Sequence, residues 1–106
     1  MSAFVDVRAK AVFSADKMRK NNLFDSERMF CDLYCFEPGQ TQAAHAHAGS
    51  DKIYYVVEGA ADVQIGSETR RLGAGEAACA APSEPHGITN PGPGRLTVLV
   101  FMAPKP

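Results

Sequence analysis

The stretch that decides the fold is residues 39–59, "GQTQAAHAHAGSDKIYYVVEG", in which two of the chain's three histidines stand one residue apart. "TQAAHAH" and "KIYYVVEG" each predict a strand, and the second is rich in β-branched and aromatic residues. Side chains two positions apart on a strand point to the same face, so His45 and His47 can converge on one metal ion. The alanines on either side leave room for such an ion.

The rest of the chain also consists of short segments that have the pattern of strands. Short apolar segments, such as "RMFCDLYCFEPG" at residues 28–39 and "RLTVLVFMA" at residues 95–103, alternate with turns rich in glycine, proline and asparagine. This pattern predicts about six to nine short strands and favours an all-β sandwich, jelly roll or small barrel. One stretch with helical signals, residues 14–22, is expected to form only a single turn or an extended arm.

The composition excludes several classes of protein. The 106 residues predict one domain, with 45% hydrophobic and 22% charged residues and a net charge of −1. The charges form no basic stripe, which argues against nucleic-acid binding. The apolar runs are too short to cross a bilayer, and the N-terminus lacks a secretory pattern, so we expect a cytoplasmic protein without membrane contacts. Three cysteines without a C-x-x-C pair predict neither a disulfide framework nor a zinc ribbon.

The third histidine completes a resemblance to a known family. "GQTQAAHAH" has the G-x5-H-x-H form of the first cupin motif, which Gly59 closes. The second cupin motif, G-x5-P-x-G-x2-H-x3-N, has a partial match in "GEAACAAPSEPHGITN", where Gly75, His86 and Asn90 fall in register. The motif's proline and its second glycine are replaced, by Ala81 and Ser83. The chain therefore resembles the small single-domain cupins.

This resemblance implies a double-stranded β-helix, the jelly-roll cupin barrel, over residues 28–103. Residues 1–27 would then be an arm or strand that packs on the barrel or on a dimer partner, and residues 104–106 a tail. All three histidines fall on the family's ligand positions, which implies a divalent transition metal (iron, zinc, nickel or manganese) held by His45, His47 and His86.

Lys52 departs from the family pattern. Related cupins usually carry a glutamate there as a fourth ligand, whereas an ammonium group has no lone pair and repels a cation. Three arrangements stay open. The metal can sit on three histidines with Lys52 turned aside, or Lys52 can occupy a metal-free pocket that binds an anion. In the third, a bulge turns Asp51 inward as a fourth ligand. Tyr54 shares a face with Lys52, so both are candidates to line the pocket.

Two functions follow from these residues. The first is a metal-dependent dioxygenase or isomerase that acts on a small organic acid or carbonyl compound. The second is a non-catalytic module that binds or senses a small anion. A vestigial site in a structural dimer is a third interpretation. The N-terminal thirty residues carry more apolar surface than an arm needs, so we expect a homodimer.

Overall fold

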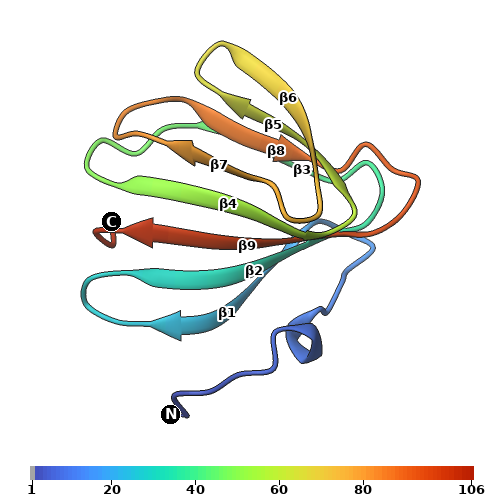
Figure 1. Ribbon diagram of the computed structural model, residues 1–106, viewed down its shortest axis with the longest axis horizontal. Coiled ribbons are helices and arrows are strands. Elements are labelled where there is room, and N and C mark those ends of the chain that lie inside the picture. Colours follow the sequence, from blue (N-terminus) through green and yellow to red (C-terminus); the bar gives the residue numbers. More distant parts are fainter. Residues whose placement is uncertain (1) are drawn as a thin grey trace.

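A computed structural model describes residues 2–106 and contains nine strands and one short 3-10 helix (Figure 1). The predicted number of strands is therefore confirmed at its upper end. In chain order the elements are η1 (Arg8–Lys10), β1 (Arg19–Asp25), β2 (Phe30–Phe36), β3 (Thr41–His45), β4 (Asp51–Glu58), β5 (Ala60–Ile65), β6 (Glu68–Gly73), β7 (Ala77–Ala80), β8 (His86–Thr89) and β9 (Leu96–Ala103).

The strands form two antiparallel sheets. The larger has the order β1-β2-β9-β4-β7, and the smaller has the order β3-β8-β5-β6. Chain neighbours such as β3 and β4 belong to different sheets, as in a jelly roll. The sheets enclose one main core between them, to which β2, β4, β5, β8 and β9 contribute. The predicted all-β double-stranded β-helix is confirmed.

The strand β2 is apolar at nearly every position because both of its faces are covered. Its inner face carries Tyr34 and Phe36 into the core between the sheets. Its outer face carries Cys31, Leu33 and Cys35 into a second cluster. The N-terminal segment covers that outer cluster with Val5, Val7, Ala11 and Phe13. The sequence pattern left open which face looks inward, and the structure assigns the aromatic face to the barrel.

Residues 14–22 lead into a strand rather than a helix. The only helical turn described in residues 2–106 lies earlier, at Arg8–Lys10, and β1 begins at Arg19 and pairs with β2 of the same chain. Lys20 and Asn22 stand opposite Tyr34 and Asp32 in this pairing. These polar residues interrupt the apolar alternation, which is why the sequence pattern did not identify β1. No helix in residues 2–106 has the length and apolar character that a bilayer crossing requires.

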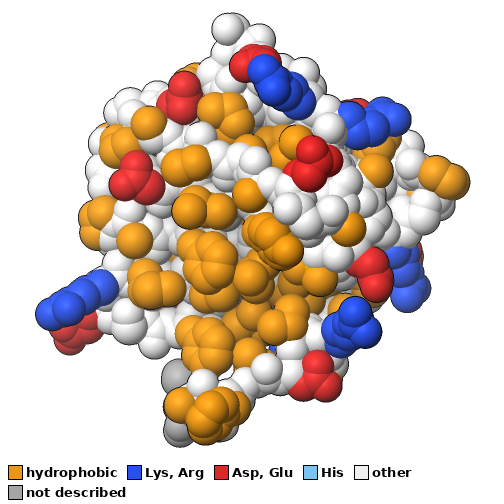
Figure 2. All heavy atoms as spheres, in the orientation of Figure 1, with side chains coloured by type: hydrophobic (Ala, Val, Ile, Leu, Met, Phe, Trp, Pro, Cys, Tyr) orange, Lys and Arg blue, Asp and Glu red, His pale blue; other side chains and the backbone are white. Residues whose placement is uncertain are grey.

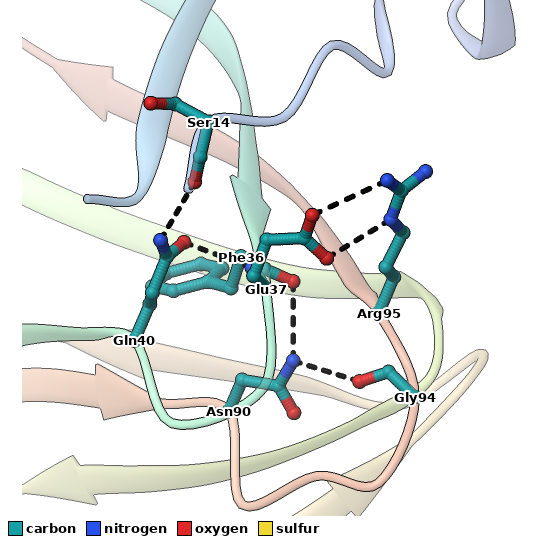
Figure 3. Close-up of polar contacts among 7 residues, drawn as sticks. All are labelled: Ser14, Phe36, Glu37, Gln40, Asn90, Gly94 and Arg95. Carbon is teal, nitrogen blue, oxygen red and sulfur yellow. Dashed lines mark hydrogen bonds and ion pairs between the residues drawn. The ribbon is translucent and has the colours of Figure 1, made fainter. Parts of the chain in front are cut away.

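Asn90 follows directly after β8, which begins at His86, and its hydrogen bonds to neighbouring segments are drawn in Figure 3. This side chain is 1% exposed, and its amide nitrogen donates to the carbonyl oxygens of Phe36 at 3.1 Å and Gly94 at 2.9 Å. Its amide oxygen accepts from the backbone nitrogen of Gly92 at 2.9 Å. Asn90 is therefore a structural residue that joins the ends of β2 and β8 to the loop before β9.

The glycine that closes the first motif is required by packing. Gly59 connects β4 to β5 with a φ of 91°, in the left-handed region. A Cβ atom at this position would collide with the carbonyl oxygen of Arg95. The turn from the larger sheet to the smaller one therefore needs glycine.

Candidate metal centre

His45 and His86 are brought together by strand pairing. β3 and β8 are antiparallel neighbours, and His45 stands directly opposite His86 in their register. Their ring centroids are 4.3 Å apart, and His86 is only 2% exposed. Two residues that are 41 positions apart in sequence therefore share one end of the barrel because of the sheet register.

His47 reaches the same point from a loop. The sequence pattern placed both histidines of the pair on one strand, but β3 ends at His45. The backbone carbonyl of His47 accepts a 2.7 Å hydrogen bond from the backbone nitrogen of Ser83. This contact holds the loop against the segment before β8, with the ring of His47 4.9 Å from that of His45. Ser83 has a φ of 67°, a left-handed conformation that explains why the family motif has glycine there.

The three imidazoles present donor atoms suited to a metal. One nitrogen from each ring lies within 4.8 Å of the others. The Nδ1 atoms of His45 and His86 lie 2.9 Å from the carbonyl oxygens of Ala43 and Glu84. A carbonyl oxygen only accepts, so both Nδ1 atoms carry a proton, and the neutral form of each ring has its lone pair on Nε2.

The protonation state of the cluster also fits a metal. Burial lowers the pKa of His86, and burial together with the proximity of His45 and the charge of Lys52 lowers the pKa of His47. Both rings therefore stay neutral near pH 7. The Nε2 atom of His86 is buried and has no hydrogen-bond partner among the described residues. An unpartnered buried nitrogen is costly unless a ligand fills the place, and a divalent transition metal would do so.

Lys52 points into the pocket. It is 2% exposed, and its Nζ atom lies 3.5 Å from both His45 Nε2 and Gln42 Oε1. The same nitrogen lies 5.4 and 5.2 Å from the ring centroids of Tyr34 and Tyr54, within cation–π range. Burial, and then the charge of Lys20, lower the pKa of Lys52 to about 8. The ammonium group is thus a neighbour of the histidine cluster and is not turned aside into solvent.

Asp51 lies away from this cluster. The residues of β4 alternate between exposed and buried from Asp51 to Val56, which leaves Asp51 exposed on the opposite face from Lys52. The register irregularity of β4 comes later, between Val56 and Glu58. The bulge that would turn Asp51 inward is therefore not at Asp51, and the structure does not bring this carboxylate to the three histidines.

Tyr54 lies beside Lys52 but is not part of the pocket lining, and hydrogen bonds join it to Gln42 and Tyr34, which are. Tyr54 is fully buried and donates to Gln42 Oε1 at 2.9 Å, while the amide nitrogen of Gln42 donates to the hydroxyl of Tyr34 at 3.4 Å. Burial raises the pKa of Tyr34 to about 12 and also raises that of Tyr54, so both hydroxyls keep their protons. Gln42 was not found from the sequence. The register of β3 shifts between Gln42 and His45, so simple alternation assigns these two residues to opposite faces.

The cluster opens into a pocket of about 460 Å³. The pocket contains the predicted residues Lys52, His45 and His47, together with Lys20 from β1, which the sequence did not single out. Its lining is Lys20, Phe30, Tyr34, Gln42, Ala43, Ala44, His45, His47, Lys52, Met102 and Pro106. A jelly-roll barrel with a histidine cluster at one open end defines the class as a small single-domain cupin.

Comparison with known families gives the same result. The cupin domain model matches residues 32–102, so the chain belongs to the cupin family. A tetracenomycin polyketide synthase protein, TcmJ from Streptomyces glaucescens, is 35% identical over 72 residues, which are 65% of this chain and 48% of that protein. The chain therefore spans about half the length of this curated relative.

Solved structures share the fold over nearly the whole chain. TT1209 from Thermus thermophilus is 42% identical with a TM-score of 0.96, over 99% of this chain and 100% of that one. A protein with a double-stranded β-helix domain from Klebsiella pneumoniae is 25% identical with a TM-score of 0.90, over 98% and 91% of the two chains. KdgF from a Halomonas species is 24% identical with a TM-score of 0.85, over 100% and 96%, and supports the fold alone.

Proposed function

We propose that this cupin is a metal-dependent enzyme that enolises or isomerises a small organic acid or carbonyl compound. The observation that carries the proposal is the set of three convergent imidazoles, one of which has a buried and unpartnered Nε2 atom. His45, His47 and His86 would hold a divalent iron, zinc, nickel or manganese ion. When bound, such an ion supplies Lewis-acid polarisation of a carbonyl or carboxylate oxygen.

Lys52 has the position and the charge to assist this chemistry. Its ammonium group lies beside the ligand nitrogen of His45, so it can donate a hydrogen bond to the oxygen on which negative charge develops. Tyr54 and Gln42 hold the walls around it, and Tyr54 OH points to Gln42 rather than to solvent. In enolisation the proton beside the carbonyl leaves to water in the open pocket, the electron pair of the C–H bond forms the carbon–carbon double bond, and the π pair of the carbonyl moves onto its oxygen. A proton from water later returns to carbon.

Deuterium exchange tests the proposal without knowledge of the natural substrate. Small 2-oxo acids would be incubated in deuterium oxide with protein loaded with zinc, nickel, manganese or, under anaerobic conditions, ferrous ion, and exchange followed by proton NMR. We expect exchange that depends on metal and is lost in His45→Ala and His86→Ala, while Lys17→Met, outside the metal pocket, keeps it. Equal exchange by wild type and His86→Ala would overturn the proposal.

A second function is supported by the same lysine. The ammonium group of Lys52 lies 3.5 Å from His45 Nε2 and so occupies the neighbourhood of a ligand lone pair. This favours a metal-free module that binds a small anion through Lys52. Elemental analysis of protein purified without a polyhistidine tag separates the two. Less than about a tenth of an equivalent of transition metal, with no uptake on reconstitution, would favour the binding module.

We also propose that the protein is a cytoplasmic homodimer. Ile53 and Tyr55 point outward from β4 and are 39% and 40% exposed. Figure 2 shows hydrophobic side chains gathered over the region where β4 and β9 lie in Figure 1. A second copy would cover this surface. Light scattering at micromolar concentration should give twice the chain mass for wild type and the chain mass for Tyr55→Glu, and monomeric wild type would contradict the dimer. The three free cysteines fit a reducing compartment.

A further inference from the structure

A second lysine stands at the entrance of the metal pocket. Lys20 projects from the inner face of β1, where it is paired in register with Tyr34. Its Nζ atom lies 5.5 Å from the ring centroid of Tyr34, and Lys52 Nζ lies 5.4 Å from the same centroid. One aromatic ring therefore has two ammonium groups as neighbours, one deep in the pocket beside His45 and one at the rim.

The two lysines are not neutralised by ion pairs. Among residues 2–106, neither lysine takes part in a salt bridge, although Arg70, Arg71, Arg95 and Lys105 do. The carboxylate that acts on Lys52 is Asp32, which accepts a 2.8 Å hydrogen bond from Asn22. One carboxylate near two ammonium groups leaves the site with a net positive charge before any metal binds.

The positive surface continues outward from the metal pocket. An adjoining pocket of about 530 Å³ shares Lys20 and Gln42 with it and adds Lys17, Met18, Arg19 and Thr41. No aspartate or glutamate lines either pocket in the described part of the chain. The two adjoining pockets are therefore lined by cations and neutral groups only, which favours the binding of anions.

We propose that the ligand of this cupin is a dianionic small molecule, whose reacting end lies at Lys52 and the histidine cluster and whose second anionic group binds Lys20. The distance between the lysines sets its size. Two ammonium groups within 5.5 Å of one centroid are less than about 11 Å apart, and two charge-assisted hydrogen bonds of about 2.8 Å leave less than about 5 Å between the bound oxygens. This limit favours a short diacid, with a backbone of about four carbons, over a longer one in its extended conformation. A carboxylate and a phosphate satisfy the distal position equally.

This inference deepens the proposed function and rests on it for the identity of the reacting end. It is tested by calorimetry at low ionic strength, on zinc-loaded and on metal-free protein. The probes are succinate, glutarate and adipate against the monocarboxylates of the same chain length, with 3-phosphoglycerate as the probe for a distal phosphate. We expect a diacid of the right length to bind about three- to tenfold more tightly than its monoacid, with a preference that weakens as salt is added.

Variants assign the preference to a residue. Lys20→Met should remove the advantage of the diacid and weaken monoacid binding much less, whereas Lys17→Met, the matched control in the adjoining pocket, should keep the advantage of the diacid. Equal affinity for diacids and monoacids in wild type, or an unchanged preference in Lys20→Met, would overturn the inference. Tighter binding of 3-phosphoglycerate than of every diacid would identify the distal group as a phosphate and support a ligand with two anionic groups.

The experiment distinguishes failure of this inference from failure of the proposed enzyme function. If the protein takes up no metal, the enzyme proposal fails while the preference for diacids is still measured on metal-free protein. If metal binds and diacids have no advantage, only the present inference fails.

Discussion

Replacement of Lys52 should change metal affinity in a graded way. Lys52→Met removes the positive charge and keeps a flexible side chain of similar length, and Lys52→Glu places a carboxylate where related cupins have one. We expect the affinity for zinc and nickel to increase from wild type to Lys52→Met and again to Lys52→Glu. The physical reason is that the ammonium repels the ion and that a glutamate attracts it and can donate an oxygen ligand.

The structure sets the size of the effect. Lys52 Nζ lies 3.5 Å from His45 Nε2. A metal–imidazole bond is about 2.1 Å long, so an ion bound to this nitrogen lies at most about 5.6 Å from the ammonium. Charges of +2 and +1 at about 5.5 Å repel by about 6 kcal/mol at an effective dielectric constant of about 20. The flexible lysine relieves most of this repulsion when it withdraws, so we expect Lys52→Met to gain at least about 1.4 kcal/mol, or tenfold in Kd.

Competition against a chromophoric chelator at fixed pH measures these constants. Lys20→Met is the matched control, because it removes a cation at the rim without touching the neighbour of His45, and it should change the Kd much less than Lys52→Met. The same Kd for wild type, Lys52→Met and Lys52→Glu would refute the reasoning. It would mean that the ion does not bind on the Nε2 side of His45.

Three other predictions concern stability and thiol chemistry. Ser83→Gly should raise the free energy of unfolding by about 1 kcal/mol, because glycine adopts the φ of 67° without strain, and the melting temperature by about 4–8 °C; a lower melting temperature would contradict this. Asn90→Ala should cost about 3 kcal/mol in denaturant unfolding, since three hydrogen bonds of a buried side chain are lost, and a cost under about 1 kcal/mol would be inconsistent with that role. Under native conditions a thiol reagent should label the exposed Cys79 quickly, and it should label Cys31 and Cys35 only on unfolding. Cys31 and Cys35 are buried, and burial raises the pKa of both thiols. Fast labelling of all three thiols would contradict the burial of Cys31 and Cys35.

The sequence predicted the jelly roll and the three histidines because both depend on local pattern. Strand segments were recognised from their apolar content, and His45 and His86 from motif spacing. The strand β1 escaped recognition because its inner-facing residues, such as Lys20, border a pocket and are polar. Such a strand is identified by its pairing partner, and pairing is not local information.

The details of the pocket depended on departures from strand regularity. Alternation correctly separated Asp51 from Lys52, because β4 is regular there. It failed for Gln42, which reaches the wall of the pocket through a register shift in β3. The sequence also left open whether the Lys52 side chain points inward. Burial of a lysine in a core is costly. Here two tyrosine rings and the side-chain amide of Gln42 surround the ammonium group, and these contacts could not be predicted from local pattern.

The charge of the pocket links the metal to the dianion. Three neutral imidazoles leave a divalent ion with its full charge, whereas a glutamate at position 52 would cancel part of it. With Lys52 and Lys20 nearby, a metal-loaded site concentrates positive charge that one carboxylate, Asp32, does not balance. A ligand with two negative charges offsets this excess, so the metal and the dianion should each strengthen the binding of the other by the same factor. Substitution of lysine for the usual acidic ligand is therefore compatible with metal binding when an anionic ligand supplies the negative charge that the protein lacks.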